Sequence, residues 1–154
     1  MRRTDAAWLS GQGLLFTLAF VVIPGTGGGF GRIAVPAARL IGSAIFLLGS
    51  VLGVLSAVRM GRQLAPQPSP VRHGSLIDTG PYAVVRHPIY TAVLLMIAGS
   101  VVRVLSLAGL LVTVVSAVFF DRKIAYEEAL LADAYPQYLA YQRRVRWKLL
   151  PGVR

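Results

Sequence analysis

The chain is a succession of long apolar runs separated by short polar connections. Apolar residues dominate four stretches, at residues 8–23, 35–58, 89–102 and 105–120. A straight helix needs about 20 apolar residues to cross the hydrocarbon core of a bilayer. Only the second stretch is comfortably long, so the others borrow flanking residues, or the last two form a tight helical hairpin across Arg103 and Val104. We favour four transmembrane helices.

A different pattern follows the fourth stretch. Between residues 121 and 141, apolar and aromatic positions recur at intervals of three, four and seven, which is helical spacing, but the segment is too polar to span a membrane. We expect this helix to lie on the cytoplasmic face, against the loop between the second and third stretches. Such packing would bring Glu127 or Glu128 toward His87 and Tyr90.

The composition agrees with this pattern. Of the 154 residues, 55% are hydrophobic and only 14% are charged, which is too apolar for an ordinary soluble domain of this size. The predicted fold is an all-α integral membrane protein with about four transmembrane helices plus a cytoplasmic C-terminal amphipathic helix. Residues 1–70 hold an N-terminal transmembrane helix pair and a Pro-rich connector, and residues 71–154 hold a loop, the helical hairpin and the C-terminal helix.

The basic residues predict the orientation in the membrane. They gather before the first stretch, between the second and third, and after the fourth, whereas the two opposite connections carry mainly Arg32 and Arg103. The positive-inside rule therefore places both termini and the middle loop in the cytoplasm, for a protein integral to the cell inner membrane. The first stretch could instead be a secretory signal, but no obvious small-residue cleavage site follows it.

The net charge of +10 raises the question of nucleic-acid binding. Basic residues beside membrane spans usually fix topology and contact anionic lipid headgroups, and no aromatic-basic platform accompanies the charge here. We therefore expect membrane lipids as partners and no nucleic acid. The absence of cysteine excludes disulfides, thiolate metal sites and a cysteine nucleophile. With only His73 and His87 as imidazoles, we expect no metal centre.

Three further segments are interpreted through their small or rigid residues. Residues 25–31 look superficially like a phosphate-binding loop, but no strand precedes them and no Lys-Ser or Lys-Thr pair ends them, so a flexible turn is the better interpretation. Residues 65–70 form a proline-rich connector that cannot be a helix interior. Small residues in the second stretch permit close helix approach, and they also suit a homodimer. These are Gly42, Ser43, Gly49, Ser50 and Gly53.

The segment at residues 80–90 is the most informative part of the chain. It reads Gly80-Pro81-Tyr82-Ala83-Val84-Val85-Arg86-His87-Pro88-Ile89-Tyr90, so rigid, charged and aromatic residues stand directly before an apolar run. Pro81 and Pro88 restrict their own backbone angles and those of the residues before them, which leaves the loop few conformations to lose on binding. We expect a pre-shaped pocket at the membrane surface.

Glu127 and Glu128 allow two interpretations from the residues alone. They can pair with Arg122 or Lys123 on a solvated helix face, where ion pairs contribute little stability, and this is the commoner situation. They can also face the 80–90 segment as part of a functional site.

Two sets of motifs, taken in order, carry a family resemblance. The first is Gly80-Pro81-Tyr82 and Arg86-His87-Pro88 with Tyr90, and the second is Glu127-Glu128 with Leu131, Tyr135-Pro136, Tyr138, Tyr141 and Leu150-Pro151. In this the chain resembles the isoprenylcysteine carboxyl methyltransferase family, which belongs to a wider group with the phospholipid methyltransferases. The resemblance covers residues 74–151, half of the chain.

The resemblance implies a membrane enzyme that uses S-adenosylmethionine without a Rossmann domain, with residues 71–154 as the methyltransferase core. It implies catalytic roles for Glu128, Arg122 and Arg86, with Lys123 as an alternative to Arg122. The implied cofactor-binding residues are Gly80, Pro81, Tyr82, His87, Pro88, Tyr90, Glu127 and Glu128. Thr91 stands where many relatives carry a small residue such as glycine.

The resemblance also implies a lipidic or prenylated acceptor, and a small lipid-like one suits a chain of this length. A carboxylate acceptor, as in isoprenylcysteine O-methylation, needs no base, and Arg122 or Arg86 would orient it. An amine or thiol must lose a proton, so Glu128 or His87 becomes the candidate base.

Two other functions stay open. One is a membrane reductase that acts on a lipid double bond and binds a nicotinamide cofactor such as NADPH. Its distinguishing feature is a 2′-phosphate site built from clustered arginines, and Arg143, Arg144 and Arg146 could be misread as such a site. The other is a non-catalytic membrane protein that binds anionic lipid through the same arginines.

Overall fold

The computed structural model describes residues 3–22, 36–65, 68 and 74–152. Within these residues all regular elements are helical, which confirms the all-α prediction. The longer elements are α1 (Arg3–Thr17), α3 (Pro36–Met60), α4 (Pro88–Val104), α5 (Leu107–Ala134) and α6 (Tyr138–Arg144). Shorter turns are the π-helical η1 (Leu18–Val22) and the 3₁₀ turns η2 (Gly61–Gln63) and η3 (Gly80–Ala83). The predictions for residues 25–31 and His73, and most of the proline-rich connector, lie outside the described residues.

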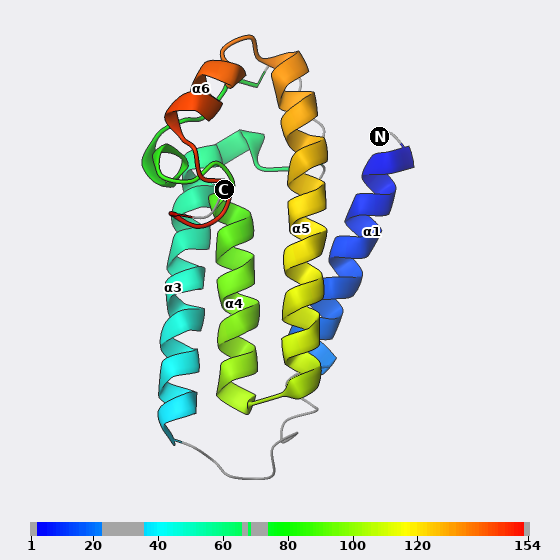
Figure 1. Cartoon of the computed structure of the whole chain (residues 1–154), viewed down its shortest axis with the longest axis vertical. Helices are drawn as coiled ribbons and strands as arrows, with labels where there is room; N and C mark the ends of the chain where they lie inside the picture. The colour runs from blue at the N-terminus through cyan, green and yellow to red at the C-terminus, as the bar shows by residue number, and fades with distance from the viewer. Residues whose placement is uncertain (1–2, 23–35, 66–67, 69–73, 153–154) are drawn as a thin grey trace.

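The four long helices run alternately in opposite directions (Figure 1). The chain ascends through α3, descends through α4 and ascends again through α5, and α1 lies beside α5. We call the end that carries η3 and α6 the motif end, and the opposite end, where Leu105 and Ser106 join α4 to α5, the hairpin end. The start of α4 and the C-terminal half of α5 therefore meet at the motif end, although they are distant in the sequence.

Among the residues that the structure describes, one helix is long and apolar enough to cross a membrane. It comprises α3 and η2, 28 residues from Pro36 to Gln63. The 17 residues of α4 extend only about 25 Å at 1.5 Å per residue, which is less than the hydrocarbon core of about 30 Å. In α5 the charged residues Asp121, Arg122 and Lys123 interrupt the apolar run after its first half. Four complete spans therefore remain a prediction.

The structure corrects two details of the predicted C-terminal half. The hairpin turns at Leu105 and Ser106 rather than at residues 103–104, because Leu105 takes a left-handed conformation (φ 49°) and Ser106 caps α5 by accepting a hydrogen bond from Gly109 N at 3.0 Å. The prediction of a separate amphipathic helix after the fourth apolar stretch is also wrong. Residues 119–134 contain neither proline nor glycine, so α5 continues unbroken past the apolar stretch to Ala134, and the short α6 follows.

The closest helix crossing is between α3 and α4, and it depends on glycine. A Cβ atom on Gly42 would lie 2.6 Å from the Gly99 carbonyl oxygen, and one on Gly99 would lie 2.6 Å from Phe46 N. Backbone atoms cannot yield at these distances, so the two helices need glycine at both positions. The predicted close approach is thus realised within one chain, and the homodimer stays a prediction.

Aromatic side chains hold α1 on α5. The Trp8 ring meets Phe119 edge to face at 5.2 Å between centroids and stacks near Tyr126 at 6.1 Å. The Tyr126 hydroxyl also lies 3.0 Å from Thr4 Oγ1. These contacts fix α1 beside the motif end, where Gln12 reaches toward α5.

Replacing Gly99 with alanine should destabilise the bundle, because its methyl group would overlap the α3 backbone. Overpacking of this kind typically costs about 1–3 kcal/mol. We expect a lower thermal unfolding midpoint for Gly99→Ala in detergent micelles. Gly13→Ala is the matched control, since a Cβ on that helical glycine meets nothing within 4 Å. An unchanged midpoint for Gly99→Ala would contradict the crossing described here.

Candidate functional site

Prolines shape the backbone at the motif end. Pro81 lies in the first turn of η3, and Pro88 is the first residue of α4, where its missing N–H leaves no intrahelical hydrogen bond unmade. Gly80 has φ 61°, and a Cβ there would come within 3.0 Å of Arg59 Nε. The loop therefore turns tightly against the end of α3 and buries Tyr82.

A buried carboxylate joins the loop to α5. Glu128 Oε1 accepts a hydrogen bond from Arg86 Nε at 2.6 Å and lies 3.2 Å from His87 Nε2, while its Oε2 accepts from Gln142 Nε2 at 3.1 Å. The Arg86 and Glu128 side chains are only 8% and 11% exposed. Arg86 Nη1 also donates to the Val145 carbonyl at 2.8 Å. One ion-paired cluster thus connects the loop between η3 and α4 with α5, α6 and the C-terminal segment.

The charge state of Glu128 is set by these partners. Burial alone would raise its pKa, but the hydrogen bonds and positive charges of His87 and Arg86 outweigh burial and lower the pKa to about 2. The carboxylate is therefore ionised at neutral pH.

Glu127 occupies a different environment from its neighbour. Its Oε2 accepts a hydrogen bond from the Tyr90 hydroxyl at 2.7 Å. The Tyr90 ring stacks between His87, at 5.7 Å, and Phe120, at 4.9 Å, and the buried Lys123 ammonium lies 5.2 Å from its centroid. The helix therefore directs Glu127 at the tyrosine and Glu128 at the Arg-His pair.

The C-terminal segment passes over the motif and is bonded to it. Arg86 N donates to the Trp147 carbonyl at 2.9 Å, and His87 N donates to the Lys148 carbonyl at 3.0 Å. Thr91 Oγ1 donates to the Leu149 carbonyl at 2.6 Å. The hydroxyl of Thr91 thus has a local role that a glycine could not fill.

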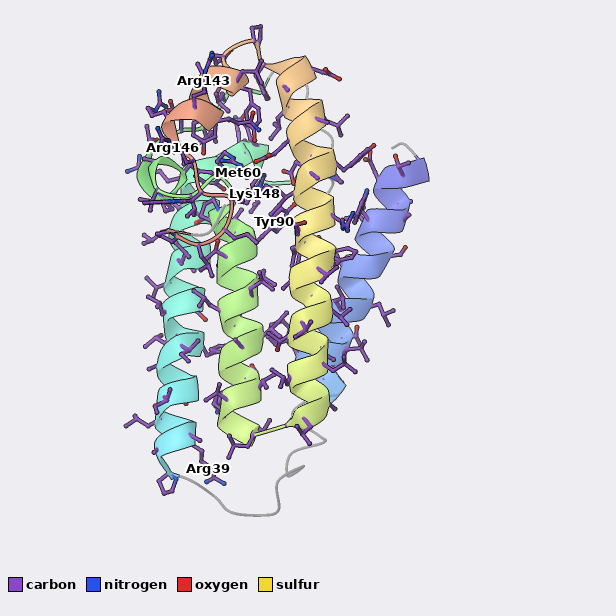
Figure 2. The ribbon with its side chains drawn as sticks, viewed as in Figure 1. Arg39, Met60, Tyr90, Arg143, Arg146 and Lys148 are labelled. Carbon is purple, nitrogen blue, oxygen red and sulfur yellow. The ribbon has the colours of Figure 1, made fainter. Side chains whose placement is uncertain are left out.

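Two cavities meet at this cluster. A smaller one of about 100 Å³ lies under the loop and α6, and a larger one of about 420 Å³ lies between α1, the end of α3, α4 and α5. Tyr82, His87 and Glu127 line both, together with Met60 and Ala65. Figure 2 shows Met60 and Tyr90 near each other at the motif end.

The smaller cavity has the side chains that an adenosyl amino acid would need. The Tyr138 side chain is buried and lines this cavity, yet among the described residues its hydroxyl has no hydrogen-bond partner. A buried hydroxyl without a partner is costly, which indicates a ligand contact. Burial raises the pKa of Tyr138, so it stays a neutral donor. Glu127 adds a carboxylate for a cation, and Leu76 and Ile77 add apolar wall. S-adenosylmethionine fits this donor set.

The structure gathers most of the residues proposed from the sequence. Tyr82, His87, Tyr90 and Glu127 line a cavity, and Arg86 lines the smaller one. Gly80, Pro81 and Pro88 line neither and instead shape the backbone. Glu128 is occupied by its partners in the cluster. These placements do not test the roles proposed for them.

Arg122 is not brought to the site. Its side chain is exposed on α5 and lines neither cavity, because the helix turns it away from the bundle. Lys123, one position later, is fully buried and donates to Gln12 Oε1. The prediction missed Gln12, Met60 and the free hydroxyl of Tyr138. The first two belong to apolar helices and carry no motif.

The part of the chain that holds these side chains matches a known family. The phospholipid methyltransferase family matches residues 37–138, which include α3, the 80–90 segment, α4 and α5. The chain belongs to the phospholipid methyltransferase family. This confirms the resemblance to that wider group.

A curated relative is similar over a shorter segment. The chain is 35% identical over 74 residues to the cobalt-zinc-cadmium resistance protein CzcN of Cupriavidus metallidurans. The aligned segment covers 47% of this chain and 34% of that protein. The matched segment of this phospholipid methyltransferase family member therefore spans about a third of the length of that relative.

Removing the Glu128 charge should unfold the motif end. Loss of one partner from a buried ion pair typically costs about 3–5 kcal/mol, so Glu128→Gln should lower the unfolding midpoint at pH 7. Because the folded pKa is about 2 and the ordinary value is 4.5, the wild type should lose this stabilisation as the pH falls from 4.5 through 2. Glu128→Gln should lose less over that range.

The control for this pH experiment is Asp133→Asn, which removes an exposed carboxylate from the same helix. Its midpoint should follow that of the wild type at every pH. Equal acid losses in the wild type and Glu128→Gln would show that another carboxylate is responsible.

Proposed function

We propose that this protein is an S-adenosylmethionine-dependent methyltransferase that methylates a lipid-like acceptor at the cytoplasmic face of the cell inner membrane. The observation that carries the proposal is the pair of cavities that share Tyr82, His87 and Glu127. A smaller cavity with a larger polar share of its lining, beside a larger and more apolar one, suits a water-soluble cofactor and a lipidic partner that must meet.

The cofactor is assigned to the residues of the smaller cavity and to those that it shares with the larger one, because about 100 Å³ alone is less than a small-molecule site of about 300–1,000 Å³. When bound, S-adenosylmethionine supplies a methyl group activated by a sulfonium charge. The Glu127 carboxylate and the Tyr82 ring face can stabilise a cation, and a cation–aromatic contact contributes about 0.5–2 kcal/mol. The Tyr138 hydroxyl supplies a hydrogen bond. The Arg86–Glu128 pair holds this wall in place, so both are positioning residues rather than groups that contact the reacting atoms.

The larger cavity is assigned to the acceptor. Phe16, Leu64, Ile89 and Val93 give it an apolar wall that can hold an acyl or prenyl chain. Its volume of about 420 Å³ lies in the range of small-molecule sites, about 300–1,000 Å³. An in-line displacement needs alignment of the two reactants and exclusion of water more than it needs acid-base groups.

The lining chemistry favours an amine over a carboxylate acceptor. Among the described residues that line the larger cavity there is no arginine or lysine to hold a carboxylate, and Glu127 is the carboxylate present. Glu127 can attract a protonated amine and take up its proton. Isoprenylcysteine-type carboxyl methylation is the second acceptor chemistry. The cation available to orient its carboxylate would be Lys123, which donates to Gln12, a residue that lines the larger cavity.

The orientation follows from charge. The basic residues after α5 and between α3 and α4 lie at the motif end, and the positive-inside rule assigns such an end to the cytoplasm. Figure 2 shows Arg143, Arg146 and Lys148 gathered there. None of Arg143, Arg144 and Arg146 lines either of the two cavities at the motif end.

Tyr138→Phe should weaken cofactor binding without harming the fold. One net hydrogen bond is worth about 0.5–1.5 kcal/mol, so we expect the Kd for S-adenosylmethionine to rise about threefold to tenfold. The unfolding midpoint of the ligand-free protein should not fall, because the hydroxyl has no partner to lose. Isothermal titration and thermal unfolding in detergent measure both.

Tyr126→Phe is the control for that titration, because its hydroxyl faces Thr4 outside both cavities. S-adenosylhomocysteine and NADPH are titrated alongside. Binding of NADPH alone would contradict the proposal and favour a lipid reductase. If none of the three ligands gives a heat of binding, a lipid-binding protein would be favoured instead.

A comparison of two methyl acceptors should separate the two acceptor chemistries. Labelled-methyl transfer is measured to an aminophospholipid and to a prenylcysteine. We expect transfer to the aminophospholipid by the wild type and at least a tenfold loss in Glu127→Gln. Arg122→Gln, exposed on α5, should retain the wild-type rate. Transfer to prenylcysteine alone would overturn the amine assignment while leaving the methyltransferase in place.

A further inference from the structure

A third cavity lies at the hairpin end, away from the candidate active site. It has a volume of about 240 Å³ and is lined by Arg39, Ser43, Ser100, Arg103 and Val104. The first two belong to the start of α3, and the others belong to the end of α4. Figure 2 shows Arg39 at the end of the bundle opposite Met60 and Tyr90. This cavity shares no lining residue with the two at the motif end.

Helix geometry makes the four polar side chains converge. Arg39 and Ser43 are four residues apart on α3, and Ser100 and Arg103 are three apart on α4, so each pair lies on one helix face. The stem of Arg103 rests on Gly42, where a Cβ would lie 2.6 Å from Arg103 Cγ. The glycine crossing therefore holds the second guanidinium group against the first helix.

The two arginines have no carboxylate to pair with. Residues 6–77 and 79–120 contain neither aspartate nor glutamate, so acidic side chains are confined to segments at the motif end. Within the part of the chain that the structure describes, neither Arg39 nor Arg103 forms an ion pair. Two like charges at one cavity repel each other, and Arg39 in the first turn of α3 is also unfavourable to the helix dipole. A bound anion would relieve both costs.

The two serines behave differently from other hydroxyls in the same helices. Ser50 donates to the Phe46 carbonyl at 2.9 Å, and Ser56 donates to the Leu52 carbonyl at 2.6 Å. Such bonds to the preceding turn are the usual arrangement in apolar helices. Neither Ser43 nor Ser100 makes one in the described structure, so their hydroxyls remain available to a ligand.

We propose that this cavity binds a phosphate group, and that in the membrane it is the phosphate of an anionic phospholipid headgroup. Guanidinium groups match the oxygens of phosphate through paired, charge-assisted hydrogen bonds, and serine hydroxyls complete the donor set. The cavity lies at the start of α3, the helix long enough to cross the bilayer, so it lies at the depth of the headgroups in the leaflet opposite the active site. The site binds lipid and takes no part in the methyl transfer.

The test is a lipid titration of the full-length protein in detergent. Phosphatidylglycerol and phosphatidylcholine are added in parallel, and bound lipid is counted by native mass spectrometry. We expect saturable binding of phosphatidylglycerol by the wild type. The double variant Arg39→Gln with Arg103→Gln should raise its apparent Kd about tenfold or more. Ser43→Ala with Ser100→Ala, which changes no charge, should raise it about threefold.

The matched control is Arg143→Gln with Arg146→Gln, which removes two exposed arginines from the motif end. It should keep the wild-type apparent Kd for phosphatidylglycerol. An equal loss of affinity in the two double-arginine variants would overturn the site. So would an affinity that stays unchanged in both the double-serine variant and the Arg39 and Arg103 variant. Full displacement of the lipid by millimolar inorganic phosphate would overturn its assignment to a lipid headgroup. Since binding is measured without cofactor, a failed methyltransferase assay leaves this result unaffected.

Discussion

The buried contact between Glu128 and the Arg86–His87 pair is the interaction on which the motif end depends. It joins a loop before α4 to a helix some forty residues later, and Gln142 and the Val145 carbonyl extend it to the C-terminal segment. Burying these charges is favourable only because each has a partner. The cluster therefore fixes the wall of the smaller cavity and leaves Glu127, on the adjacent face of α5, to line the space between the two cavities.

The sequence was sufficient to predict the helices and to predict which motif residues lie close together. Apolar runs mark helices whatever their neighbours, and the Arg-His-Pro and Glu-Glu motifs indicated that loop and helix would meet. The sequence could not assign Glu127 and Glu128 to separate partners, nor choose between Arg122 and Lys123. Those choices depend on the rotation of α5 about its axis. That rotation is set by tertiary contacts such as Trp8 with Phe119, which no local pattern contains.

The same limit explains the residues that sequence reasoning missed. Gln12 is one polar residue in an apolar helix, and its position opposite Lys123 follows from how α1 docks. Tyr138 belonged to the recognised motif, but the absence of a partner for its hydroxyl is a property of packing alone. The sequence does not predict the continuity of α5, because the hydrophobic pattern changes at residue 121, although nothing there interrupts the backbone.

The unbroken α5 gives the molecule a mechanical property. It extends as one rod from the hairpin end, through the apolar layer, to the glutamates beside the cavities. Membrane proteins accommodate a change in bilayer thickness by tilting their helices. A tilt of α5 about its contact with α4 would move Glu127 and Glu128 together relative to the loop. Because Glu128 is bonded to Arg86 and His87 in that loop, such a tilt would also pull on the buried ion-paired cluster.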